Sequence, residues 1–506
     1  MASQSFIHNP LGRVQLLLLG GPRGVLFLGT LYAAAVILFL TMVHRLSSDQ
    51  VTTARFAAVS MYVILFIIEL IVLLLGGTSL ISKAVQRDFT SDMITSHRMS
   101  AMSGHSAVLG YMTGSPAQVY TLSLVNWIIC TFLARLASPG VPSAMLVPSF
   151  LFVLFGCTAW MIFTLAVLLA VCTRGSQLTA GLVVVLVMLT NAKAMTYVPG
   201  VALLLSSATY SEMAAAASSS STTPTLDPWM AVSVLAQLVL GLIFFLAAAL
   251  RMHRDDYTAF SPRLAYILLA FGALLATIGL GVWKPPASII PVPGSDDDRL
   301  KINATLVILC LIAILPVANA ARNHVDWRRR RAKDPAFQGR APWHFVVAAI
   351  VATFMVASIW SAVAGKWFYV ILEELQDEVD GSYSPFQRAG AVVAAFLLAL
   401  LIAGCVFRIH RRATSPIPSG GLSIAMLLPL IVYLTVYWIL PVAADLALEA
   451  TTRPLSQTDR SLLFTCSPVG TWITACSNTV APIWSGLAVQ AGLFVLLMAL
   501  TSRARR

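Results

Sequence analysis

Two ionisable side chains fall inside long apolar runs of the chain: Glu69 in FIIELIVLLL and Lys193 in LTNAKAMTYV. A charged group at the centre of a membrane-spanning helix costs roughly 2.5–3.5 kcal/mol on insertion scales, so such groups usually face the bundle interior and find a partner. One hypothesis is that both lie near a translocation path and pair with each other. The alternative is that Lys193 marks a span boundary, while Glu69 is hydrogen-bonded inside the bundle.

The other reactive residue types form no catalytic pattern. The sequence has no GxxxxGK[ST] phosphate loop, no HExxH and no CxxC, and its eight histidines are scattered around the expected ends of the spans. We therefore assign no catalytic, cofactor-binding or metal-binding residue and expect that the chain is not an enzyme. Cys466 and Cys476 fall in an expected external loop, where an oxidising compartment would allow a disulfide; two free thiols are the alternative.

Composition indicates which elements must position these residues. The 506 residues are 58% hydrophobic and 11% charged, with a mean hydropathy of +0.83. Each membrane span takes about 20 apolar residues, so the sequence predicts an all-α, polytopic membrane protein. We expect about twelve transmembrane helices, at 24–43, 57–76, 118–136, 145–171, 177–206, 230–250, 262–283, 302–321, 343–364, 388–407, 421–443 and 483–502.

Charge sets the expected orientation. An even number of spans puts both termini on one side, and with both termini cytoplasmic the inside loops hold about twice as many Lys and Arg as the outside loops. The same rule accounts for the net charge of +12 without nucleic acid as a partner. We expect a multi-pass protein of the cell inner membrane, in contact with membrane lipids. Residues 1–23 are interpreted as an interfacial segment on the cytoplasmic face, or as an ordinary tail.

The stretch from Ile81 to Tyr120 is polar although it lies between two apolar runs. Ile81, Val85, Phe89 and Met93 recur every four residues among charged neighbours, which is typical of an amphipathic helix. This topology places the stretch in the cytoplasm. A docking element for a partner and a plain solvated loop both fit the pattern.

This stretch resembles the cytoplasmic loop after the second span in permease subunits of ABC-2-type transporters. That loop usually opens with an acidic residue, continues as a short helix and a Ser-Pro-Leu-Ser turn, and ends near Gly-Lys. Here the counterparts run from Gln86 to Ser100 and close at Gly110, with His97 where proline is common and Tyr111 in place of lysine. The resemblance implies a loop that docks a separate ATPase, through Gln86, Arg87, Asp88, Asp92, His97, Arg98 and Gly110.

The resemblance covers roughly the first 250 residues and implies an organisation into 1–23, a six-span permease region at 24–255 with its docking loop at 81–120, and a second six-span region at 256–506. It further implies an exporter subunit that uses ATP through its partner and works with a second permease or as a homodimer. The main alternative is an ion-coupled secondary transporter with Glu69 as proton carrier; a membrane-embedded glycosyl- or acyltransferase is a third. The basic loop from Arg322 to Trp343 fits a second docking surface, a topogenic signal or an anionic-lipid patch.

Overall fold

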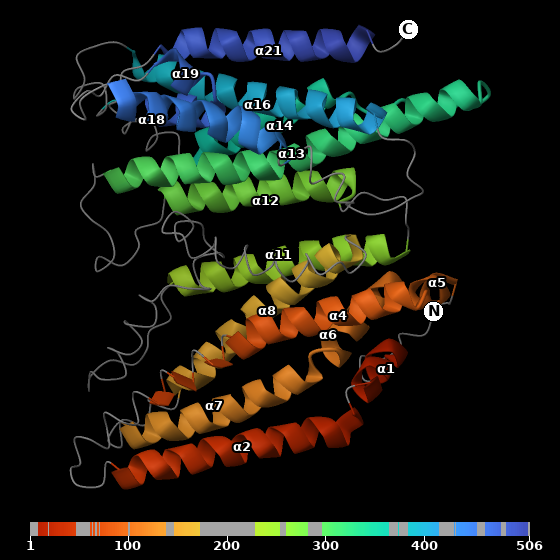
Figure 1. Cartoon of the computed structure of the whole chain (residues 1–506), viewed down its shortest axis with the longest axis vertical. Coiled ribbons are helices and arrows are strands. Elements are labelled where there is room, and N and C mark those ends of the chain that lie inside the picture. The colour runs from red at the N-terminus through yellow and green to blue at the C-terminus, as the bar shows by residue number, and fades with distance from the viewer. Residues whose placement is uncertain are drawn as a thin grey trace. The chain divides into compact units, whose positions relative to one another are not determined.

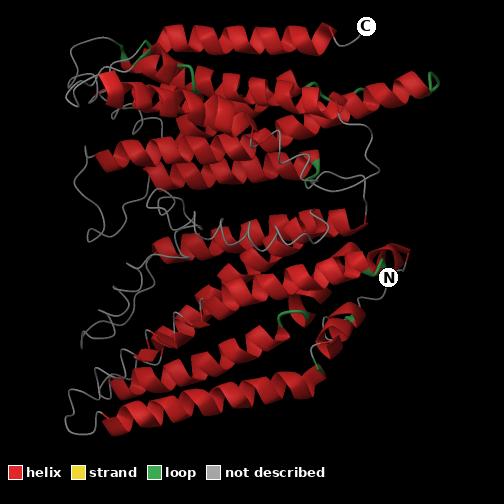
Figure 2. Cartoon of the chain, viewed as in Figure 1, coloured by secondary structure: helices red, strands yellow, loops and turns green. Residues whose placement is uncertain are grey.

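The computed structural model describes most of the expected helical regions (Figure 1). The described residues are 9–18, 20–46, 61–62, 64–65, 68–69, 71–99, 102–137, 146–172, 228–253, 260–281, 296–363, 373, 383–413, 430, 432–452, 461–476 and 482–503. Throughout these residues the regular structure is helical and contains no strand (Figure 2). The chain divides into two compact units, Met1–Ala259 and Phe260–Arg506, whereas the sequence analysis expected a boundary between residues 255 and 256.

The first unit contains eight described α-helices and one π-helix. In chain order these are α1 (Pro10–Leu18), α2 (Gly21–Leu46), η2 (Ile71–Gly76), α4 (Gly77–Thr90), α5 (Met93–Met99), α6 (Gly104–Gly114), α7 (Ala117–Ala137), α8 (Leu146–Cys172) and α11 (Pro228–His253). Helices α8 and α11 pack against each other closely, with Trp160 of α8 seated against Gly241 of α11. Helix α4 crosses α8 where Gly77 leaves room for the ring of Phe163. Small residues at such crossings let membrane helices approach closely.

The second unit is built around α13 and α16. Its helices are α12 (Pro262–Gly281), α13 (Asp296–Lys333), α14 (Phe345–Val363), α16 (Pro385–Ala413), η6 (Leu434–Ile439), α18 (Leu440–Thr452), α19 (Leu462–Thr465), α20 (Pro468–Ala475) and α21 (Ile483–Arg503). Buried alanines line the central helices and are joined by a few large side chains, among them the fully buried Phe345 and Trp472. Phe345 packs on Gly404, where an added Cβ would lie 2.2 Å from the ring.

The stretch from Ala444 to Pro482, which the sequence predicts as an external loop containing Cys466 and Cys476, is partly helical. Helices α19 and α20 lie within this stretch, and α20 packs against α13, α16 and α21. Gln490 of α21 holds them in place: its side-chain nitrogen donates to the Thr465 carbonyl at 2.8 Å and to the Thr471 hydroxyl at 2.9 Å. Tyr437 of η6 donates to the Gln490 side-chain oxygen at 2.9 Å. Hydropathy missed this insert because its polar side chains satisfy one another inside the core.

The described helices confirm an all-α polytopic membrane protein. Eight of them are long and apolar enough to cross a membrane: Gly21–Leu38, Ala117–Arg135, Phe155–Cys172, Val234–Met252, Thr305–Lys333, Phe345–Ala362, Pro385–Arg412 and Ile483–Ser502. Each lies at the position of an expected span. Shorter apolar helices at Pro262–Ile278 and Leu434–Ala447 overlap two further expected spans. The expected span 177–206 lies outside the described residues, and the span 57–76 is described only in part.

Candidate functional site

The stretch from Ile81 to Tyr120, which we call the docking segment after the role that the family resemblance implies for it, folds as helices rather than as an open loop. Most of α4, all of α5 and α6 and the start of α7 fall within it. Helix α4 buries Ile81, Ala84 and Val85 on one face, as the four-residue spacing predicted. Two of the positions in that spacing behave differently, because Phe89 is half-buried and Met93 is exposed.

The chain turns between α4 and α5 at Asp92, which has a left-handed backbone conformation with φ of 55°. Aspartate tolerates this conformation better than most residues because its short polar side chain can bond locally. Here the Asp92 carboxylate accepts from the Thr95 hydroxyl at 2.7 Å. Asp92 therefore shapes the exposed end of the docking segment.

Asp88 is the centre of the docking segment and is only 1% exposed. Its Oδ2 accepts from the Tyr111 hydroxyl of α6 at 2.5 Å and from Gln15 Nε2 of α1 at 3.3 Å. His97 Nε2 of α5 lies 3.6 Å from the same oxygen. One buried carboxylate thus joins four helices. We call these four residues the Asp88 cluster.

A buried carboxylate is tolerated only when hydrogen bonds or opposite charges replace its lost hydration. Tyr111 meets this need, since it is fully buried beside the carboxylate. Its burial and the Asp88 charge raise the pKa of Tyr111 well above its usual range, so the hydroxyl remains a donor at all physiological pH values. The Asp88 cluster is therefore a fixed structural tie.

Helix α1 packs against α6 through glycines. A Cβ added at Gly110 would lie 2.8 Å from the Leu11 Cβ, and one added at Gly114 would lie 2.3 Å from the Gly12 carbonyl oxygen. The Asn9 side chain caps α1 by accepting from the Leu11 and Gly12 amides at 3.1 and 3.2 Å, and it donates to the Ser106 carbonyl. The N-terminal segment, expected as an interfacial helix or a tail, is helical over Pro10–Leu18 and bound to the docking segment.

The residues named from the family resemblance fall into three groups. Arg87 and Asp92 are exposed, and Gln86 and His97 are half-buried. Asp88 and Gly110 are internal, where they bind α6 and α1. Arg98 belongs to α5, but its side chain is outside the described set.

Sequence reasoning missed two members of the Asp88 cluster and the most exposed part of the tip. Gln15 is the one polar residue in the run VQLLLL, which was the only signal for it. Tyr111 was noticed merely as a departure from the family pattern. Met93 and Met99, at the two ends of α5, are 40% and 79% exposed, and they place apolar surface on this part of the docking segment, which we call its tip.

Glu69 lies in a second buried network, just before η2. It is 6% exposed, accepts from Asn126 Nδ2 at 3.0 Å and accepts from the Ser123 hydroxyl. Asn126 in turn accepts from the Tyr32 hydroxyl at 2.6 Å, so the network joins α2 and α7 to the helix of Glu69. Lys193 lies outside the described residues, and its pairing with Glu69 remains a prediction.

Cys466 and Cys476 are free thiols in the structure. Cys466 is half-buried at the end of α19, and Cys476 is fully buried at the end of α20. The expected disulfide between them is therefore not present in this structure.

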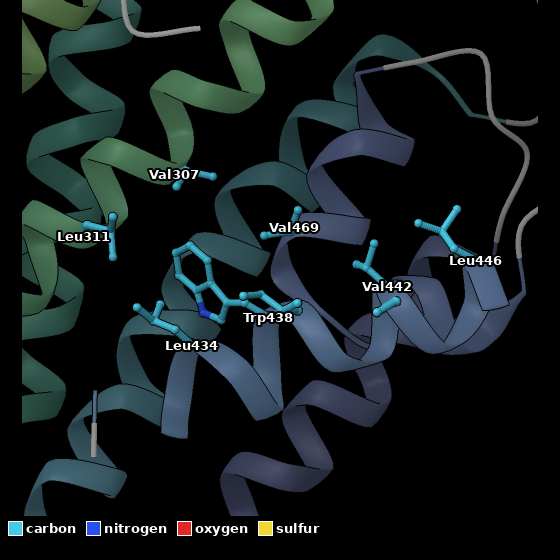
Figure 3. A pocket seen from close by; sticks show the side chains of 9 residues that line it. Val307, Leu311, Leu434, Trp438, Val442, Leu446 and Val469 are labelled. Atoms are coloured by element: carbon cyan, nitrogen blue, oxygen red, sulfur yellow. The ribbon is translucent and has the colours of Figure 1, made fainter. Parts of the chain in front are cut away.

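The second unit also holds a pocket of about 470 Å³ that is lined almost entirely by apolar side-chain surface. In Figure 3 the Trp438 indole points toward Val307 and Leu311 of α13, with Leu434 on one side of it and Val469 of α20 on the other. Among the described residues, no three His, Cys, Asp or Glu side chains are close enough to hold a metal ion.

The architecture defines the class of protein: an all-α polytopic membrane protein with a folded polar segment between two of its spans. No family model, curated protein or solved structure matches the chain.

Proposed function

We propose that the chain is the membrane-spanning subunit of an ABC-2-type exporter of the cell inner membrane, driven by a separate ATPase that docks on the docking segment. The observation that carries the proposal is that the docking segment is held by a buried hydrogen-bond cluster and also exposes two apolar side chains. The Asp88 cluster ties α4 and α5 to α6 and α1. The two exposed side chains are Met93 and Met99.

This arrangement suits a segment that receives force. An exposed methionine pair flanked by charged residues can bury apolar area against a partner while the charges select its orientation. A displacement of α4 would move α6 and α1 as well, because the buried Asp88 carboxylate is hydrogen-bonded to both. Helix α1 leads into α2 through Gly20 and Gly21, both with positive φ, so movement at the docking segment reaches the first span.

A photo-crosslinking amino acid at Met99 tests the proposal in cells, with mass spectrometry of the crosslinked product. The proposal expects a protein with Walker nucleotide-binding motifs at Met99. The same probe at Phe386, which is 82% exposed and which the charge asymmetry places on the outer side, is the matched control and should not capture it. Equal capture at the two positions, or a Met99 product that never includes an ATPase, would refute the docking role.

Glu69 favours one other candidate, a transporter driven by an ion gradient. A buried carboxylate with hydrogen-bond donors is the kind of group that carries protons within membranes. Transport by vesicles that contain a proton gradient but no ATP would favour this alternative over the ABC-2 proposal.

A further inference from the structure

The carboxyl end of α13 carries four successive arginines, Arg328 to Arg331, and is followed by Lys333 and Arg340. Within the second unit, this end of α13 projects past the ends of α16 and α21 (Figure 1). It also extends beyond the most apolar part of the helix, because the last turns are mainly charged. The helix thus continues as a rigid, strongly basic extension.

Some of the basic groups in this region have structural partners. Arg411 of α16 donates through Nε and Nη2 to Asp326 at 2.9 to 3.2 Å, which is the forked geometry that arginine and carboxylate favour. Arg329 donates to the carbonyls of Arg411 and Arg412 at 3.0 and 3.2 Å, at the end of α16. These contacts hold α13 against α16. They do not involve the basic side chains further along α13.

Four of the remaining cations lie on the surface. Arg330, Arg331, Lys333 and Arg340 are all exposed, and none of them forms an ion pair with a described carboxylate. The nearby Asp334 side chain instead accepts from the Ala336 amide at 3.0 Å.

The surface that bears these cations is folded. The Arg331 guanidinium lies 5.3 Å above the Trp327 ring, and the Trp327 indole donates to the Gly339 carbonyl at 2.7 Å. This bond fixes the return of the chain from α13 toward α14. Trp343, at the end of the return, is 60% exposed and lies next to the apolar span Phe345–Ala362.

We propose that this surface, formed by Arg330, Arg331, Lys333, Arg340 and Trp343 and here called the basic end of α13, binds the phosphate headgroups of anionic membrane lipids. Tryptophan favours the headgroup depth of a bilayer, and clustered basic residues beside a span attract anionic lipids. A topogenic signal needs only the charges. The cation–π contact holds Arg331 against Trp327, and the Trp327 bond to Gly339 fixes the chain next to Arg340, so part of this basic surface is folded around its charges.

The test measures binding of a fluorescent phosphatidylglycerol and a fluorescent phosphatidylcholine to the full-length purified chain. The triple variant Arg330→Gln, Lys333→Gln, Arg340→Gln removes three charges and leaves the Arg331 contact with Trp327 intact. Each basic residue near a membrane surface is worth roughly a fivefold change in partition, so we expect the preference for phosphatidylglycerol to fall by at least about tenfold. Added salt should reduce the preference of the parent chain in the same direction.

Two controls keep the proposal falsifiable. Lys83→Gln, Arg135→Gln, Arg263→Gln removes three exposed cations that lie outside the basic end of α13 and should leave the preference within about twofold. Arg330→Lys, Arg340→Lys preserves charge and should retain it. An unchanged preference in the first triple variant, an equal loss in the control, or insensitivity of the parent to salt would overturn the proposal. So would a loss of ATPase binding in the triple variant with lipid preference intact, because the surface would then serve a protein partner.

Discussion

Replacing Tyr111 with phenylalanine removes one hydroxyl from the Asp88 cluster and leaves the aromatic ring in its buried site. The lost bond is the 2.5 Å contact with Asp88, so the carboxylate retains only Gln15 at 3.3 Å and His97 at 3.6 Å. A hydrogen bond to a charged group contributes about 1.5–3 kcal/mol. We expect the contact of α6 with α4 to weaken by that amount, which corresponds to roughly a 10-fold to 150-fold rise in local opening.

Hydrogen exchange of the purified chain measures this opening directly. The amides of α1 and α6 should lose protection in Tyr111→Phe, while those of α13 and α16 in the other unit should not change. Tyr120→Phe is the matched control, because the Tyr120 hydroxyl donates to a neutral carbonyl, that of Met112, at 2.8 Å. A neutral bond contributes about 0.5–1.5 kcal/mol, so the control should be affected less.

The stability that Tyr111 contributes depends on pH. The folded pKa of Tyr111 is raised above its ordinary value of 10.0, so its contribution to stability is fully present below pH 10 and declines only as pH rises toward that raised value. Equal loss of protection in the two tyrosine variants would refute this account of the Asp88 cluster. A Tyr111→Phe effect that disappears between about pH 6 and about pH 9 would refute it as well.

Three further predictions follow from the contacts. Gly114→Ala should release α1 at a cost of about 1–3 kcal/mol, seen as lost exchange protection in α1, whereas Gly156→Ala should be tolerated because nothing lies within 4 Å of its added Cβ. If the Glu69 carboxylate is structural, Glu69→Gln should leave ATP-driven transport in vesicles within roughly threefold of the parent. If Glu69→Gln abolishes transport driven by a proton gradient, the result would support the ion-coupled alternative. Burial raises the pKa of Cys476 to about 12, so this thiol should alkylate far more slowly than Cys466 in the native chain. After unfolding, the two thiols should alkylate at the same rate. A disulfide between them, found by non-reducing mass mapping, would contradict the structure.

Hydropathy was enough to predict the class of fold and the places of eight spans, because a membrane span is a property of some 20 consecutive residues. Four-residue spacing likewise predicted the buried face of α4. The Asp88 cluster could not be predicted in this way, because Gln15 and Tyr111 are far from Asp88 in the sequence. A glutamine or a tyrosine also gives no indication of which residue it will bind.

The α19–α20 insert was missed for a related reason. Its Thr465 and Thr471 appear in the sequence as the polar residues of an outer loop, and only their bonds to Gln490 explain their burial. Local patterns locate elements that bury a continuous apolar face. They fail where polar groups are buried in pairs drawn from distant segments.

The dependence of the α19–α20 insert on Gln490 has a consequence for biosynthesis. Gln490 belongs to α21, which follows η6, α19 and α20 in the chain, so the bonds to Thr465, Thr471 and Tyr437 can form only after α21 has been synthesised. Until then the half-assembled bundle carries polar groups that quality-control machinery can recognise. A nonsense mutation just before α21 should therefore send the second unit to degradation.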